Sequence, residues 1–196
     1  MSSHHFVKEG QEPALIIIDA LALELAEPLL EWVPLVVVVD NVLEDVKRWG
    51  IKIDVVIQSV LEPEQISELL SDQFPLLIIA GKPQDSSIVT ALNYCISTKQ
   101  GAVNLLMNPS PERFKLLEAF AHLNINVITQ HEKWLLCRQR FEKWMPAKSL
   151  LSVQQTSHNQ QISIEGLILK GSKAESTQDG PIRIQSPALF WVGDSL

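Results

Sequence analysis

Polar side chains follow two apolar runs in the first third of the chain, and they are the first candidates for chemistry. Asp40 and Asn41 come directly after the unbroken apolar run 35–39, and Gln58 and Ser59 follow the next such run. Runs without alternation are typical of parallel strands that are covered on both faces. Ligands of parallel sheets bind beyond the carboxyl ends of the strands. The sequence therefore predicts a binding site around these four polar residues.

The segment between the two runs indicates a helix, so the whole stretch is a strand–helix–strand unit. Apolar residues recur at helical spacing from Val42 to Trp49, and Gly50 follows where a left-handed residue ends a helix. The same alternation predicts further strands at 14–18, 74–80, 102–107, 125–129 and 134–137, and helices at 21–30, 63–70, 86–96 and 111–122. This alternation is typical of a Rossmann-like, three-layer α/β domain with a mostly parallel sheet.

The pattern changes after residue 138, and no convincing helix follows. Short apolar segments separated by Ser, Asn, Gly and Asp predict strands at 150–154, 161–169, 182–185 and 189–192. We therefore expect a nucleotide-binding-like α/β domain over residues 1–140 and a small all-β, sandwich-like domain over residues 146–196. About fifty residues of short strands bury little apolar surface. For this reason we expect the β-domain to be stabilised in a homodimer.

Composition limits the class of protein and its compartment. The 196 residues carry a net charge of −7 without a basic patch, which argues against a nucleic-acid partner. No apolar run has the length of a signal-peptide core or a membrane span, so no membrane association is expected. Cys95 and Cys137 lie in apolar patterns outside any CxxC pair, which predicts buried, reduced thiols and a cytoplasmic protein. His4 and His5, near the N-terminus, are a weak ligand set for a metal.

Two further motifs are incomplete. Gly81 and Lys82 follow a predicted strand as in a phosphate loop, but no glycine lies five residues earlier. Pro83 also removes a backbone amide that a phosphate would need. His122 and His131 have no second His or Cys at ligand spacing, which favours solvated or core histidines over a metal site.

Considered together, the strand ends resemble those of the thiamine pyrophosphokinase (thiamine diphosphokinase) family, whose two-domain layout the chain matches over nearly its full length. The segments that carry the resemblance in the α/β domain are DNV at 40–42, ID at 53–54, QSVLE at 58–62, QDSS at 84–87 and ERFKL at 112–116. They stand where the family has an Asp-Gly-Gly type turn, a Pro-Asp pair, Gly-Asp-x-Asp-Ser, Asp-x-Thr-Asp and Gly-Gly-Arg-x-Asp-His. In the β-domain, KSLLSV at 148–153 and IEGL at 164–167 resemble a Ser-containing strand and a Thr-x-Gly-Leu strand.

The resemblance implies a reaction, its cofactors and a set of residues. The family converts ATP and thiamine to AMP and thiamine diphosphate, with Mg²⁺ held by carboxylates. The catalytic candidates retained at matching positions are Asp40, Asp85 and Arg113. The nucleotide-binding candidates are Asn41, Asp54, Gln58, Ser59, Ser86, Ser87 and Lys115. The thiamine-binding candidates are Trp144, Ser149 and Ser152. The resemblance implies a homodimer as well.

The same comparison predicts weakened chemistry. Ser59, Leu61, Ser87 and Lys115 occupy positions where the family pattern has acids. The loss of one close carboxylate removes several kcal/mol of attraction to a divalent ion at an effective dielectric of about 20, so we expect no metal site to be intact. Three hypotheses follow. The chain is a divergent member that binds a ligand without transferring diphosphate, an active divergent enzyme, or a non-catalytic structural or interaction protein.

Overall fold

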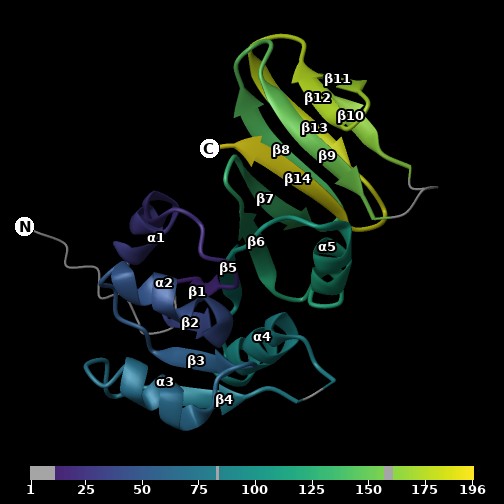
Figure 1. Cartoon of the computed structure of the whole chain (residues 1–196). Coiled ribbons are helices and arrows are strands. Elements are labelled where there is room, and N and C mark those ends of the chain that lie inside the picture. Colours follow the sequence, from purple (N-terminus) through teal and green to yellow (C-terminus); the bar gives the residue numbers. More distant parts are fainter. Residues whose placement is uncertain (1–11, 83, 157–160) are drawn as a thin grey trace, which may run out of the picture. The chain divides into compact units, whose positions relative to one another are not determined.

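The computed structural model describes residues 12–82, 84–156 and 161–196 (Figure 1). The chain folds as two compact units, Met1–Asn108 and Pro109–Leu196. His4, His5 and Pro83 lie outside the described residues. Within the described ranges, no helix combines the length and the apolar character that crossing a membrane requires.

A parallel sheet forms the centre of the first unit. Its described strands are β1 (Ala14–Ile17), β2 (Val36–Val39), β3 (Val55–Gln58), β4 (Leu77–Ala80) and β5 (Ala102–Leu106). They lie in the order β5-β1-β2-β3-β4, and all the pairs between them are parallel. Every residue of β1 and β2 is buried, as their unbroken apolar runs indicate. The predicted mostly parallel α/β sheet is confirmed.

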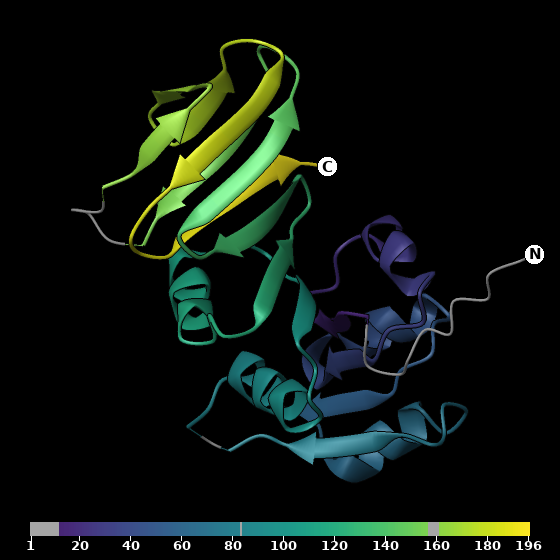
Figure 2. The same cartoon turned by 180° about the vertical axis from the view of Figure 1, so that it is seen from behind.

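Helices cover both faces of this sheet. They are α2 (Leu43–Arg48), α3 (Pro63–Leu69) and α4 (Ser87–Ser97). The chain steps outward from β1 to β4 and then returns past β1 to β5, so right-handed crossovers place α2 and α3 on one face and α4 on the other. Figures 1 and 2, seen from opposite sides, show α3 and α4 on opposite faces of β4.

The predicted helix at 21–30 is not continuous. A short 3-10 helix, η1 (Leu23–Leu25), is followed by a separate turn of α-helix, α1 (Glu27–Leu30). Pro28 lies in the first turn of α1, where its missing N–H needs no partner. Farther into a helix the proline ring clashes with the carbonyl four residues earlier. This restriction explains why the helix restarts instead of running through from residue 21.

The second unit begins with α5 (Pro111–Glu118) and continues as antiparallel strands. The larger of its described sheets has the order β11-β12-β9-β14-β7-β6 and contains β6 (Asn124–Ile128), β7 (Glu132–Cys137), β9 (Leu150–Gln155), β11 (Leu167–Lys170), β12 (Lys173–Ser176) and β14 (Phe190–Ser195). The smaller has the order β10-β13-β8 and contains β8 (Arg140–Met145), β10 (Ser163–Glu165) and β13 (Gly180–Gln185). Met145 and Ile184 from the smaller sheet share a core with Leu151 and Phe190 from the larger.

Three parts of the second unit differ from the strand prediction, one of them β12, which lies at 173–176 where no strand was predicted. Residues 141–145, between the two predicted domains, belong to β8, which pairs along its whole length with β13. The predicted strand at 161–169 is two strands on either side of Gly166. This glycine has a left-handed φ of 74°, and a Cβ there would lie 3.1 Å from the carbonyl oxygen of Pro181. Only glycine accommodates both the φ angle and the close approach.

Both cysteines are free and buried, as predicted. Burial in an apolar environment raises the pKa of the Cys95 thiol and of the Cys137 thiol to about 12. Neither is therefore a thiolate at neutral pH, and both act as small apolar core residues.

Candidate functional site

A cleft of 410 Å³ lies at the carboxyl ends of β3 and β4 in the first unit. It is lined by the turn after β3, the turn after β4 and the beginning of α4. The lining residues are Gln58, Ser59, Val60, Leu61, Glu62, Ala80, Gly81, Lys82, Asp85 and Ser87. This end of a parallel sheet is where ligands bind in such folds. A second cleft of 330 Å³ lies between β4 and α4 and shares Ala80, Lys82 and Asp85 with the first.

The Asp40 carboxylate holds the turn after β3 in place. Its Oδ2 accepts hydrogen bonds from the backbone N–H groups of Ser59, Val60 and Leu61, at 2.8, 2.7 and 2.7 Å. Its Oδ1 accepts a further hydrogen bond from the Ser59 hydroxyl. The side chain is only 3% exposed. Four donors therefore converge on this carboxylate, and they fix one side of the cleft.

The hydrogen bonds decide the charge state of Asp40. Burial by itself raises the pKa of this carboxyl, because it disfavours the charged form. The hydrogen bonds from the Ser59 side chain and from the backbone of Ser59, Val60 and Leu61 act in the opposite direction and outweigh it. The pKa of Asp40 therefore lies below its ordinary value, and the group is ionised at neutral pH.

The structure brings together four of the residues that the sequence predicted for the first unit. Gln58, Ser59, Asp85 and Ser87 all line the cleft. The neighbouring Ser86 is the N-cap of α4, and its hydroxyl oxygen accepts the N–H of Val89 at 3.3 Å.

Two other predicted residues lie elsewhere. Asn41 is exposed and does not line the cleft. Asp54 lies at the amino end of β3, where its Oδ2 accepts the N–H of Val36 at 2.9 Å. The Pro-Asp resemblance placed Asp54 among the nucleotide-binding candidates. In the structure, Asp54 lies at the end of β3 opposite to the cleft, where its hydrogen bond orders the beginning of β2.

Lys82 is the cation among the cleft residues that the sequence prediction missed. It is exposed and lines both clefts. The sequence signal is present, since Gly81 and Lys82 follow a strand directly, but the glycine pattern of a complete phosphate loop is absent. A lysine at the end of a parallel strand needs no such loop to reach a ligand. Gly81 itself is tightly placed, because a Cβ there would lie 3.2 Å from the Gln58 carbonyl oxygen.

The predicted residues of the second unit lie in different surroundings. Arg113 and Lys115 are on α5, where the Arg113 N–H donates to the Ser110 hydroxyl at 3.2 Å. Trp144 on β8 is 61% exposed. The Ser149 N–H donates to the Ser176 hydroxyl at 2.9 Å.

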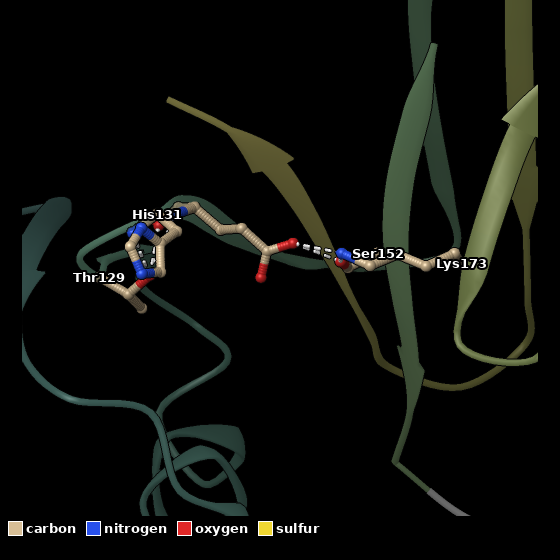
Figure 3. Close-up of polar contacts among 5 residues, drawn as sticks. Thr129, His131, Ser152 and Lys173 are labelled. Atoms are coloured by element: carbon tan, nitrogen blue, oxygen red, sulfur yellow. Dashed lines mark hydrogen bonds and ion pairs between the residues drawn. The ribbon is translucent and has the colours of Figure 1, made fainter. Parts of the chain in front are cut away.

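Ser152 belongs to a charged cluster on the larger sheet of the second unit. Its hydroxyl donates to Glu132 Oε1 at 2.5 Å and accepts from Lys173 Nζ at 2.6 Å. Lys173 Nζ also donates to Glu132 Oε1 at 2.8 Å. Figure 3 shows Ser152 and Lys173 next to each other, and Thr129 and His131 together at the other end of the group of residues drawn. Ser152 is only 4% exposed, so its hydroxyl is committed to these two partners.

No protein-family model matches the sequence, and no curated protein matches it. Its structure does match solved structures over nearly the full length. The thiamine pyrophosphokinase from Geobacillus thermodenitrificans has a TM-score of 0.71 at 14% identity, over 93% of this chain and 97% of that chain. The Candida albicans enzyme has a TM-score of 0.70 at 8% identity, over 94% of this chain and 90% of that chain. The yeast enzyme has a TM-score of 0.71 at 8% identity, over 98% of this chain and 88% of that chain.

The chain has the thiamine pyrophosphokinase fold. The family resemblance of the strand ends implied this fold, and the solved structures confirm it.

The magnesium ion implied by the resemblance needs carboxylate oxygens with free lone pairs. Among the described residues, no three His, Cys, Asp or Glu side chains lie close enough together to hold a metal ion. The Asp40 carboxylate already accepts four hydrogen bonds. The acids among the residues that line the cleft are Asp85 and Glu62. These side chains do not fit a magnesium ion held by several carboxylates.

The Ser152 cluster gives a pH-dependent prediction for this fold. Burial raises the pKa of Glu132, but hydrogen bonds from Lys173 and Ser152 outweigh burial and hold the pKa below its ordinary value. A lowered folded-state pKa stabilises the protein above the unfolded-state pKa of about 4.3, and this stabilisation is lost as the pH falls through the folded-state pKa. We expect Lys173→Met to cost about 1 kcal/mol at pH 7 and much less in acid, as measured by urea denaturation.

Lys170→Met is the matched control for this prediction. Lys170 and Glu175 form an ion pair at 2.6 Å, in which the lysine side chain is 62% exposed. An exposed pair contributes little, so this variant should cost less than about 0.5 kcal/mol. Equal losses of stability in the two variants would mean that the buried Ser152 hydroxyl adds nothing to the ion pair between Lys173 and Glu132.

Proposed function

We propose that the chain is a divergent member of the thiamine pyrophosphokinase family that binds a nucleotide in the cleft without transferring its diphosphoryl group at an enzyme-like rate. The engagement of Asp40 is the observation that carries this proposal. In the family pattern this acid precedes others that hold a metal ion, whereas here three backbone N–H groups converge on its Oδ2 and the Ser59 hydroxyl donates to its Oδ1. A carboxylate that already accepts four hydrogen bonds has little capacity left to bind a magnesium ion that would neutralise phosphate oxygens.

Such a nucleotide would be contacted by three side chains of the cleft, those of Lys82, Asp85 and Ser87. The Lys82 ammonium and the Ser87 hydroxyl line the cleft at the beginning of α4, a helix of 11 residues. Cationic and hydroxyl donors next to the first amides of a helix favour phosphate oxygens. The Asp85 carboxylate, in the same cleft, would accept hydrogen bonds from ribose hydroxyls. Affinity then depends on lysine and not on a metal ion.

The test is a pair of measurements on the purified chain. With ATP, thiamine and excess Mg²⁺, we expect AMP release to stay at least a thousandfold below about one turnover per second, a rate typical of working enzymes. A ligand that binds only the folded state raises the thermal midpoint. We therefore expect ATP to raise the midpoint to the same extent in Mg²⁺ and in EDTA. Turnover near one per second that depends on Asp85 would contradict the proposal and favour the active-enzyme hypothesis.

Two lysine variants separate binding at the cleft from non-specific binding. Lys82→Gln should abolish the rise of the thermal midpoint with ATP. Lys99→Gln is the control, because Lys99 is exposed beyond the far end of α4 and lines neither cleft. If ATP, thiamine and thiamine diphosphate all leave the wild-type midpoint unchanged, the structural or interaction hypothesis is favoured instead.

Assembly and location complete the proposal. A homodimer that pairs the β-rich units is supported by the family resemblance. A cytoplasmic location is supported by the two buried, unpaired thiols. Light scattering at tens of micromolar tests the first, since a monomer mass would reject it.

A further inference from the structure

β4 is the outer strand of the first unit's sheet, and within the described part of the chain one of its sides has no partner strand. No described strand other than β3 pairs with it. The N–H groups of Leu77 and Gly81 donate to carbonyls of the β3 segment, both at 3.1 Å. Because backbone groups alternate in direction along a strand, those of Ile78 and Ala80 point away from β3. The free edge therefore presents unpaired donors and acceptors at these two residues.

This edge lacks the charged side chains that protect many outer strands. Residues 74–81 contain no charged side chain. Phe74 is 59% exposed and Leu77 is 46% exposed. Proteins commonly protect outer strands with charges, and an apolar edge without them is a site for pairing with another strand. Outer strands in the second unit are charged: β8 carries Arg140, Glu142 and Lys143, β10 carries Glu165 and β11 carries Lys170.

We propose that the free edge of β4 pairs with β4 of a second copy of this chain, antiparallel about a two-fold axis. A two-fold axis brings the same patch together from both copies, and an axis perpendicular to the strands makes them antiparallel. Antiparallel pairing brings outward-facing residues opposite each other, so Ile78 and Ala80 would bond to the same residues of the second copy.

The composition of β4 suits a second copy as the occupant. In a two-fold pair, every charge on the edge would be repeated close by on the other copy, and like charges in facing positions are destabilising. Residues 74–81, which include β4, carry no charged side chain, so the self-pairing has no such cost over this stretch. Phe74 and Leu77 extend the apolar contact beyond the backbone hydrogen bonds.

The contact is expected to be weak and reversible. Stable complexes bury about 800 Å² per partner, and a strand of 4 residues together with Phe74 covers less. The association is separate from a homodimer through the β-rich units. It should appear as a doubling of mass with rising concentration, whether the species at low concentration is a monomer or a homodimer.

Sedimentation velocity on the full chain tests the inference with matched edge variants. From about 5 to 500 µM, a range suited to weak association, we expect the wild-type mass to double reversibly. Leu77→Lys places a charge on the β4 edge and should raise the dissociation constant by about tenfold or more. Ile168→Lys, on outer strand β11 and 54% exposed, is the control and should leave the step unchanged.

Amide hydrogen exchange on the wild-type chain tests the pairing itself, without any variant. The amides of Ile78 and Ala80 should exchange more slowly at high concentration than at low concentration. The amide of Leu77, already bonded to β3, should be protected at both. A constant mass over the whole range would overturn the inference. So would loss of the step in Ile168→Lys but not in Leu77→Lys, or a mass increase that leaves the two outward amides unchanged.

Discussion

Replacing Asp40 by alanine is expected to destabilise the first unit by about 3–5 kcal/mol. The change removes the acceptor for three backbone N–H groups and the Ser59 hydroxyl at a site where the native side chain is 3% exposed. A buried donor without a partner costs about 1–3 kcal/mol, and water that enters from the cleft restores part of the loss. Urea denaturation measured at pH 7 gives the free energy of unfolding.

Asparagine at the same position separates shape from charge. The amide oxygen of Asp40→Asn can accept the three N–H groups, and its NH₂ can donate to the Ser59 hydroxyl oxygen, which accepts as well as donates. Only the charge is lost. Hydrogen bonds to charged groups are stronger than those between neutral groups by about 1 kcal/mol, so we expect a cost of about 1–2 kcal/mol at pH 7.

The pH dependence of this difference has a definite sign. The folded-state pKa of Asp40 lies below its ordinary value. The carboxylate therefore stabilises the protein above the unfolded-state pKa of about 3.9, and this contribution is lost as the pH falls through the folded-state pKa. The gap between wild type and Asp40→Asn should be constant from neutral pH down to about 5 and should narrow in acid.

Asp45→Ala is the control, because this aspartate is exposed on α2 and pairs with Arg48 at 2.7 Å. It should cost less than about 0.5 kcal/mol. If Asp40→Ala were no more destabilising than Asp45→Ala, the Asp40 carboxylate would not hold the turn. The proposal that it is unavailable to a metal ion would then lose its basis.

The role of Asp40 shows what a strand-end motif predicts and what it does not. The sequence located this acid at the end of a buried strand, and the structure places it there. Its partners are backbone amides 19 to 21 residues downstream. Backbone donors have no sequence signature, so the contact that occupies the carboxylate could not be predicted from residue types.

Strands were predictable where burial alone decides the pattern. The unbroken apolar runs of β1 and β2 identified the parallel sheet and the end of it that holds the cleft. β8, with the sequence RFEKWM, has charged and exposed residues along most of its length, and it forms because β13 pairs with it through the backbone. Pairing with a distant strand is a property of the fold, which explains why the sequence indicated a charged junction instead.

Replacing Gly193 by alanine is expected to destabilise the second unit by about 2–4 kcal/mol. Gly193 lies within β14, paired with Trp134 on β7 and with Ser152 on β9. A Cβ at this position would lie 2.7, 2.8 and 2.9 Å from three atoms of the Trp134 indole. Contacts below 3.0 Å force one group to move, and additional volume in a packed core costs about 1–3 kcal/mol or more.

The indole has little room to move. Trp134 is 9% exposed, and its ring packs on that of Phe114 with centroids 5.4 Å apart. Phe114 in turn packs on Trp191 at 4.7 Å, and Trp191 is fully buried. A shift of Trp134 would therefore disturb a row of three aromatic rings. This packing explains why a strand that carries Phe190, Trp191 and Val192 contains glycine at the next position.

A second substitution identifies the cause of the destabilisation. Trp134→Phe removes part of the indole that the new methyl group would meet, so the cost of Gly193→Ala should be smaller in the Trp134→Phe background by at least about 1 kcal/mol. Gly101→Ala is the control for glycine replacement, because a Cβ there has no atom within 4 Å. Urea denaturation followed by tryptophan fluorescence measures all four variants. Equal costs of Gly193→Ala in the two backgrounds would show that the steric contact with the indole is not what requires glycine at this position.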